Sequence, residues 1–273
     1  MEVISHGNEI RCGSYTLHSK FRSAVNFQSN DAFAFVVTAG VGAGLLNIVL
    51  REHDIEFLQN LEIENDCFYL DGVRYIRSNT RCYNSRIEVS AYDRNLFLSN
   101  LRLFEQSLLN LSHPKSLAFL LDGIRTSAFT SSFEIEYAKR CESGFRKILS
   151  GDLAGGIAVM RGLGPGLTPS GDDLISGLLI ALNMLQALQL GDYLQEIELI
   201  HQTAEGNNPF TNAFLQCVAK GQVNEKFKWS IDLLLQGGEY EINRNLNLVL
   251  NMGETSGADQ AVGFLTGLKR FLQ

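Results

Sequence analysis

The sequence lacks the residue patterns that build zinc centres and disulfide frameworks. Its five cysteines are widely spread with no Cys-x-x-Cys pair, and its five histidines include no His-x-x-x-His pair. These absences argue against a zinc enzyme and against a disulfide-stapled secreted domain. Neither a Walker A lysine nor a Gly-x-Ser-x-Gly elbow occurs, so those two catalytic templates are not indicated. Reduced, mostly structural thiols fit a cytoplasmic protein.

Excess positive charge and long apolar runs are also missing. The 273 residues carry a formal net charge of −7, and the one basic cluster, 226–229, is small. This balance argues against a nucleic-acid or membrane-surface partner. Residues 1–20 contain no signal-peptide core, and polar residues interrupt the apolar segment 174–190. We therefore expect a soluble, cytoplasmic protein.

The periodicity of apolar residues changes along the chain. Short apolar runs at 33–37 and 46–50, and a hairpin pattern at 67–76 around Asp71-Gly72, predict strands. From about residue 95 the spacing becomes helical. We expect helices at 95–111, 132–149, 171–190, 193–204, 210–219, 226–235, 241–251 and 255–272. The expected class is α+β, with a small β-rich N-terminal domain (1–94) packed on a larger, mainly helical C-terminal domain (95–273).

Proline is scarce, yet two of the four prolines fall in one stretch that opens an apolar helix. The stretch reads GLGPGLTPSGDD over residues 162–173, followed by LISGLLIAL. Gly164 and Gly166 permit backbone geometry that other residues avoid, and they allow a ligand to approach the main chain. Ser170 is expected to be the N-cap, with Asp173 three residues later completing a pair like a capping box.

Two interpretations of this stretch remain open. It is either a rigid helix start, with a cap worth about 1 kcal/mol, or a cradle for a phosphate or carboxylate at the helix N-terminus. Capping alone requires a serine and an acid, whereas the alternating glycines favour the ligand site.

A second copy of the pattern lies near the C-terminus. The sequence GETSGADQAVGFLTGL, residues 253–268, aligns Ser256 with Ser170 and Asp259 with Asp173. Both copies are a Ser-Gly-x-Asp helix start followed by a glycine one turn later. The small residue indicates close helix approach, so two helix N-termini are expected to face one shared pocket. The alternative is chance similarity between two capped helices.

These two stretches together resemble the AllH-like family, whose best-defined member is a subunit of the oxamate carbamoyltransferase of anaerobic allantoin breakdown. The segment HSKFRSAVN, residues 18–26, is similar to the family's N-terminal signature. The resemblance implies that this chain is one subunit of a complex that uses carbamoyl phosphate and oxamate, or that performs the reverse reaction on oxalurate.

Carbamoyl phosphate is already activated, so the protein needs to bind phosphate, polarise the carbonyl and orient the acceptor. We expect the substrate anion to bind the loop from Gly164 to Ser170, with Arg161 just upstream. Hydroxyls of Thr168, Thr255 and Ser256 are further anion-binding candidates, although each threonine hydroxyl could instead satisfy a loop amide, and for each threonine taken alone that alternative is favoured. His18 and Arg22 are weaker ones, since a surface histidine and arginine explain them equally well.

Asp173 and Asp259 are the candidate catalytic residues. Two carboxylates from related helix starts could orient a substrate N–H, or could hold Mg²⁺ beside a phosphate; no cofactor is required by the sequence. They could equally be caps that face their own backbones. The rival function is a non-catalytic regulatory or scaffold subunit that binds a small anion while partner subunits perform the chemistry.

Overall fold

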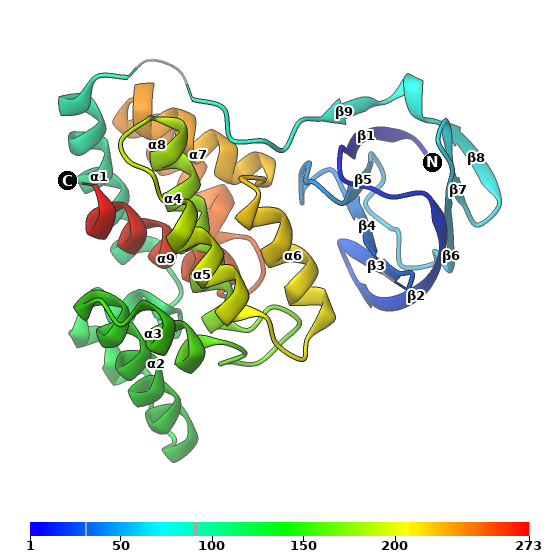
Figure 1. The fold of residues 1–273 in the computed structure, drawn as a ribbon. Helices are drawn as coiled ribbons and strands as arrows, with labels where there is room; N and C mark the ends of the chain where they lie inside the picture. The colour runs from blue at the N-terminus through cyan, green and yellow to red at the C-terminus, as the bar shows by residue number, and fades with distance from the viewer. Residues whose placement is uncertain (31, 90–91, 273) are drawn as a thin grey trace. The chain divides into compact units, whose positions relative to one another are not determined.

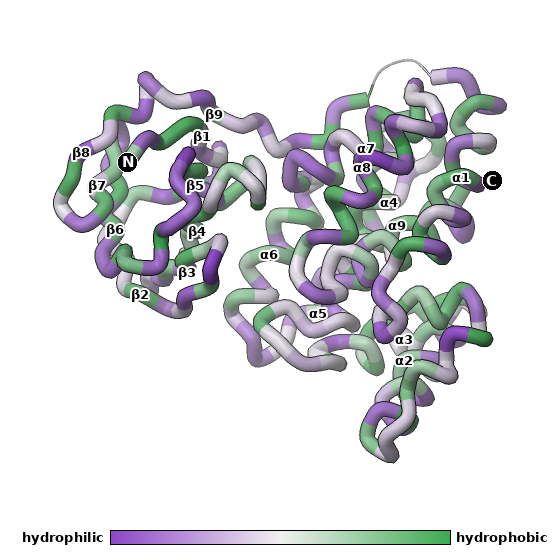
Figure 2. The backbone as a smooth tube through the Cα atoms, turned by 180° about the vertical axis from the view of Figure 1, so that it is seen from behind, coloured by the Kyte–Doolittle hydropathy of each residue, from purple (hydrophilic) through white to green (hydrophobic). Residues whose placement is uncertain are grey.

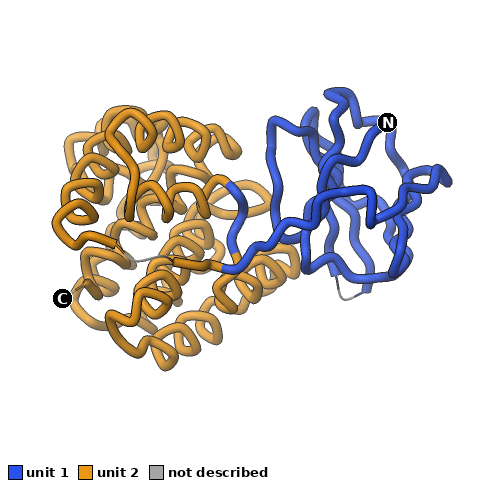
Figure 3. The backbone as a smooth tube through the Cα atoms, turned by 90° about the horizontal axis from the view of Figure 1, so that it is seen from above, with its two compact units in different colours: residues 1–86, 223–225 blue, residues 87–222, 226–273 orange. Residues whose placement is uncertain are grey.

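A computed structural model describes residues 1–30, 32–89 and 92–272. The chain forms two compact units (Figure 3). Unit 1 comprises residues 1–86 together with 223–225, and unit 2 comprises residues 87–222 and 226–273. Hydrophobic residues, green in Figure 2, occur in both units, and each unit buries hydrophobic side chains of its own.

Unit 1 is built on one mixed sheet. In the described residues its strands follow the order β8-β7-β6-β2-β3-β4-β5-β1-β9. Their bounds are β1 Val3–Gly7, β2 Gly13–Phe21, β3 Ala24–Gln28, β4 Phe33–Thr38, β5 Asn47–Leu50, β6 Asn60–Ile63, β7 Cys67–Leu70, β8 Val73–Ile76 and β9 Arg81–Tyr83. The β4–β5 and β1–β9 pairs are parallel and the others antiparallel. A 3-10 turn, η1 (Arg77–Asn79), joins β8 to β9.

The predicted hairpin at 67–76 is confirmed. Strands β7 and β8 pair antiparallel through Asp71 and Gly72, which have φ values of 47° and 81°. Two positive φ values are what a type I′ turn requires, and an Asp-Gly pair tolerates them. Fully buried side chains on one face of the sheet, such as Phe27 on β3 and Phe68 on β7, form the core of this unit.

A short segment from late in the chain belongs to unit 1. Val223 donates its amide to the Ser85 carbonyl at 2.8 Å, and its own carbonyl accepts from the Tyr83 hydroxyl at 3.0 Å. Glu225 donates its amide to the Ala43 carbonyl and pairs with Arg81. Residues more than 130 positions apart thus form one unit, an organisation without a local sequence signal.

Unit 2 is helical in its described residues (Figure 1). The helices are α1 Arg94–Leu111, α2 Ser132–Ser150, α3 Leu153–Met160, α4 Ser170–Ala187, α5 Leu194–Ala204, α6 Pro209–Ala219, α7 Glu225–Gln236, α8 Glu239–Leu250 and α9 Ser256–Phe271, with 3-10 turns η2 Leu117–Leu120 and η3 Gly123–Ala128. The eight predicted helices are confirmed within a few residues. Helix α3 was missed because Gly155 and Gly156 weaken its local helical signal.

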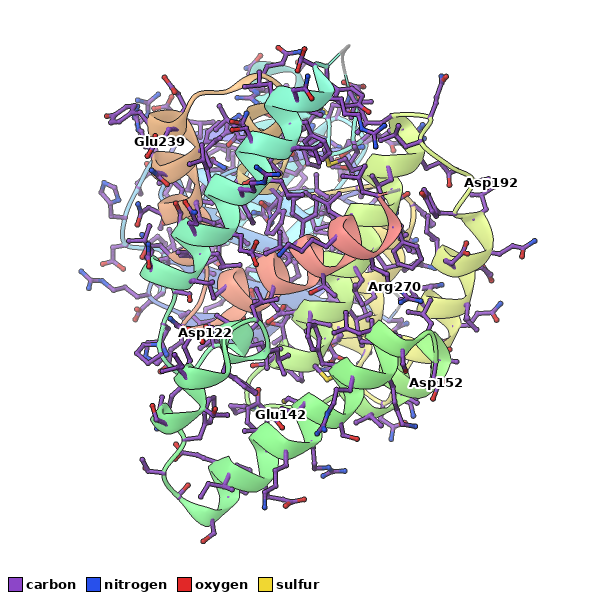
Figure 4. The ribbon with its side chains drawn as sticks, turned by 90° about the vertical axis from the view of Figure 1, so that its left-hand side faces the viewer. Asp122, Glu142, Asp152, Asp192, Glu239 and Arg270 are labelled. Atoms are coloured by element: carbon purple, nitrogen blue, oxygen red, sulfur yellow. The ribbon has the colours of Figure 1, made fainter. Side chains whose placement is uncertain are left out.

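Side chains at the ends of these helices hold them in place. Asp152 caps α3 by accepting from the Gly155 amide at 2.9 Å, and Arg270 near the end of α9 donates to the Leu149 carbonyl at 2.8 Å (Figure 4). Asn100 on α1 donates to the carbonyls of Leu233, Leu234 and Gly237 at the end of α7, at 3.0–3.2 Å.

The α+β class predicted from the sequence is confirmed by the sheet of unit 1 and the helices of unit 2. Within the described ranges, no helix is both long enough and apolar enough to cross a bilayer.

Candidate functional site

The site is organised by helices α4 and α9, which run parallel in close contact. A methyl group added at Gly177 would lie 2.0 Å from the Gln260 carbonyl oxygen, and one added at Gly263 would lie 1.9 Å from that of Leu174. Only glycine permits backbones to approach this closely. Further along, Gly267 faces Ala181, so contact positions advance together on both helices. The two helices therefore begin at the same end of unit 2.

The two helix starts also have equivalent backbone hydrogen bonds. Gly171 donates its amide to the Leu163 carbonyl at 2.8 Å, and Gly257 donates to the Met252 carbonyl at 3.0 Å. A methyl group at Gly171 would lie 1.9 Å from the carbonyl oxygen of Met160; one at Gly257 would lie 1.8 Å from that of Val249. The sequence repeat thus corresponds to a structural repeat. In each copy this amide–carbonyl bond closes a loop. The loop of the first copy, from residue 163 to residue 171, is three residues longer than that of the second, from 252 to 257.

The prediction that Ser170 caps α4 is wrong. Helix α4 begins at Ser170 itself, and the preceding Pro169 holds the cap position without a side-chain bond. The Pro169 carbonyl accepts from the amides of Asp172 and Asp173. Helix α9 likewise begins at Ser256, with Thr255 before it and no side-chain cap bond. Since each serine is the first residue of its helix and not the cap, neither hydroxyl caps its own helix.

The partners of both serine hydroxyls lie on the opposite helix. The Ser170 hydroxyl lies close enough to Asp259 to lower its pKa, and the Ser256 hydroxyl does the same for Asp173. Thr168 Oγ1 lies 3.2 Å from Ser256 Oγ and joins the loop directly to the start of α9. The two helix starts therefore exchange serine and aspartate contacts and form one cluster.

The two aspartates are buried. Asp173 is 5% exposed and Asp259 is 0% exposed, and each has an Oδ2 atom that meets no hydrogen-bond partner among the described residues. Asp259 Oδ1 accepts from the Leu117 amide at 2.6 Å. A buried carboxylate oxygen without a partner is costly when charged. Neither side chain is open to a substrate in solution in this conformation.

Burial also sets the protonation of the pair. Desolvation raises the pKa of Asp259 to about 6, against the opposing Leu117 amide and the hydroxyls of Ser170 and Thr255. Desolvation, followed by the negative charge of Asp259, raises the pKa of Asp173 well above its usual range. Burial therefore favours the protonated form of both carboxyls, and the two do not titrate independently.

The loop before α4 offers backbone donors. The amides of Gly164, Gly166, Leu167, Thr168 and Ser170 donate to no acceptor within the described part of the chain. Gly164 and Gly166 have φ values of 121° and 98°, which L side chains rarely adopt. Free amides at a helix N-terminus are suited to bind an anion.

Neighbouring segments fix this loop. The Leu167 carbonyl accepts from Asn208 Nδ2 at 2.9 Å and from Thr211 Oγ1 at 3.3 Å, and the Gly162 amide donates to Asp172 Oδ1 at 2.8 Å. Arg161 donates from Nη1 to the carbonyls of Thr203, in the last turn of α5, and Glu205, just after it, so part of its guanidinium holds the backbone.

Sequence reasoning missed the residues beneath the cluster. On α2, the Tyr137 hydroxyl lies close enough to Ser170 for that serine to lower its pKa, although burial has the larger effect and raises it. Burial likewise raises the pKa of the Cys141 thiol to about 12. Together with the Leu117 amide, they are brought to the site only by packing. No local pattern marks them.

The remaining candidates lie elsewhere or stay untested. His18 on β2 and Arg22, in the turn to β3, belong to unit 1; the His18 ring packs edge-on against Phe33. Among the described residues, no three His, Cys, Asp or Glu side chains gather as metal ligands. Magnesium binding by Asp173 and Asp259 stays a prediction.

The fold and cluster thus define an α+β protein with a duplicated helix-start site beside a glycine-rich loop. The family model described as "Oxamate carbamoyltransferase subunit AllH" matches residues 160–268, a segment that contains both Ser-Gly-x-Asp copies. The match confirms the resemblance to the AllH-like family that these motifs indicate. Searches of curated proteins and of solved structures returned no match.

Proposed function

We propose that this chain is a subunit of a carbamoyltransferase that acts on oxamate and carbamoyl phosphate, or on oxalurate and phosphate in reverse. The observation that carries the proposal is the convergence of two parallel helix N-termini with five loop amides that have no acceptor in the described chain. The family name supports the reaction class and the need for other subunits, which we expect as partners in the cytoplasm.

In this proposal the loop from Gly164 to Ser170 binds the phosphate or the carboxylate. The acceptor nitrogen attacks the carbamoyl carbon with its lone pair and forms the C–N bond. The C–O bond to phosphate breaks, its electrons stay on the phosphate, and the nitrogen releases a proton. No enzyme nucleophile is needed, so amide donors and the positive helix ends supply the stabilisation.

Asp173 and Asp259 fix the geometry of this site in the same proposal. Each lies beside the serine of the opposite helix, so their substitution should shift the loop and the two helix starts. Direct contact with substrate would require the cluster to open, because both side chains are buried.

That burial favours the second candidate function, a non-catalytic subunit that binds a small anion for regulation or assembly. Asp173→Asn and Asp259→Asn in the assembled complex separate the two candidates. Loss of turnover with intact assembly supports the enzyme subunit, whereas full turnover with both residues changed supports the non-catalytic subunit.

A thermal-shift panel with phosphate, carbamoyl phosphate, oxamate and oxalurate, each with and without Mg²⁺, tests the loop. A ligand at one hundred times its dissociation constant stabilises the fold by about 2.7 kcal/mol. Gly166→Val should abolish the shift. Gly72→Val is the matched control, because Gly72 also has a positive φ (81°) and open space around it, but lies in the hairpin of unit 1.

We expect wild type and Gly72→Val to respond alike and Gly166→Val not to respond. Equal responses in all three proteins would place the anion elsewhere. Absence of any response in wild type would contradict anion binding by this chain alone.

A further inference from the structure

The sheet of unit 1 has two ends that the chain brings together. Strands β8 and β9 are the last strands at opposite ends of the strand order, yet only Arg77–Thr80 separates them in sequence. The His6 ring on β1 meets the Phe68 ring on β7 edge-on, with centroids 5.3 Å apart. The sheet therefore curls, and a seam forms where its two ends meet.

An open surface pocket of about 400 Å³ lies at this seam. We call it the seam pocket; its polar lining includes His6, Asn65, Asp66, Arg77, Thr80 and Cys82. The volume falls in the range typical of small-molecule sites, roughly 300–1,000 Å³. All of these residues belong to unit 1.

The two principal polar groups of the seam pocket, the Arg77 guanidinium and the His6 ring, both pack against Phe68. The Arg77 guanidinium carbon lies 5.3 Å from the centroid of the Phe68 ring, and the His6 ring packs against the same side chain. Arg77 Nη1 makes one long bond of 3.4 Å to the Glu64 carbonyl, and the described residues offer it no ion pair. Its guanidinium thus retains donors for a carboxylate.

One hydrogen-bond arrangement makes His6 an acceptor toward the pocket. Thr80 Oγ1 lies 2.8 Å from the Arg77 carbonyl oxygen and 2.7 Å from His6 Nδ1; when its single proton goes to the carbonyl, the hydroxyl accepts from Nδ1. Burial and the charge of Arg77 lower the pKa of His6 and favour the neutral ring. In this arrangement the proton is on Nδ1, and Nε2 is an acceptor.

We propose that the seam pocket binds a small amphoteric molecule, with its carboxylate at Arg77 and its N–H donors at His6 and Asp66. The lining combines one cationic donor, the Arg77 guanidinium, with two acceptors, the Asp66 carboxylate and the His6 ring. A simple anion would match only the first, and a simple cation only the second kind. A molecule that carries both groups, of dipeptide size or smaller, satisfies all three.

Cys82 supplies the readout. It pairs in register with His6 on the neighbouring parallel strand, so both side chains lie on one face of the sheet, and its thiol is exposed. A bound molecule should shield it from iodoacetamide. We therefore measure alkylation of Cys82 by mass spectrometry with glycylglycine, N-acetylglycine or propionate present. Cys217 in unit 2 is the internal reference.

Glycylglycine at ten times its dissociation constant should slow Cys82 alkylation about elevenfold, and propionate should act more weakly. Arg77→Gln should abolish the protection, and Asp66→Asn should reduce glycylglycine to the level of N-acetylglycine. Arg11→Gln, an exposed arginine of the same unit outside the lining, should retain it.

Three results would overturn the proposal. They are no protection of Cys82 by any of the three probes up to their solubility limits, protection that survives Arg77→Gln, and equal protection by propionate and glycylglycine. Because the readout is in unit 1 and uses no carbamoyl compound, it stands or falls independently of the proposed function.

Discussion

Asp259→Asn should change how the stability of the protein depends on pH. In the folded protein burial raises the pKa of Asp259 from 3.8 to about 6, so the folded state holds this proton more tightly than the unfolded chain. The resulting stabilisation is fully present below about pH 4 and is lost as pH rises through 6. A difference of roughly two pKa units corresponds to about 3 kcal/mol.

Asparagine keeps the Oδ1 acceptor that the Leu117 amide requires, and it cannot ionise. Relative to wild type, the variant should therefore gain about 3 kcal/mol in the free energy of unfolding between pH 4 and pH 8. Urea unfolding followed by circular dichroism at a series of pH values measures this difference. Glu136→Gln, an exposed carboxyl on α2 in the same unit, is the control and should show no comparable trend.

The decisive quantity is the trend, not the sign of the effect at one pH. An asparagine amide placed where Oδ2 has no partner can lower stability at every pH by the same amount. A difference between variant and wild type that stays constant from pH 4 to pH 8 would refute the argument that a buried, charged Asp259 costs folding energy.

Three further predictions concern packing and reactivity. Gly263→Ala should abolish cooperative unfolding of the helical unit or lower its free energy of unfolding by more than about 4 kcal/mol. The reason is that the added methyl group would lie 1.9 Å from a carbonyl oxygen of α4. Gly123→Ala, whose methyl group would enter open space, is the control and should unfold like wild type in urea. Asn100→Ala should lower the free energy of unfolding by about 1–3 kcal/mol, since the carbonyls of Leu234 and Gly237 at the end of α7 lose their side-chain donor; an unchanged urea midpoint would contradict this. Burial raises the pKa of Cys141 to about 12, so this thiol should resist iodoacetamide at pH 8 until urea unfolds the protein. The exposed Cys12 and Cys82 should react in the native state. Mass spectrometry of the labelled peptides checks this, and rapid labelling of Cys141 in the native protein would disprove it.

Much of the local structure was determined by the sequence itself. The Asp71-Gly72 turn, the helical spacing after residue 94 and the two Ser-Gly-x-Asp copies each act over a few neighbouring residues, so their outcome is visible without the fold. The repeat even predicted close approach of two helices, which Gly177 and Gly263 confirm. The family match over 160–268 depends on the same motifs.

The tertiary structure decided how those motifs are used. The serine that local rules assign to a cap faces the other helix instead, because Pro169 occupies the cap position and α9 brings Asp259 alongside. The partners beneath the cluster, Tyr137 and the Leu117 amide, come from segments with no motif at all. The seam pocket likewise exists only because the curled sheet brings distant strands together. Burial and contact between residues far apart in sequence are properties of the packed chain, and no local pattern encodes them.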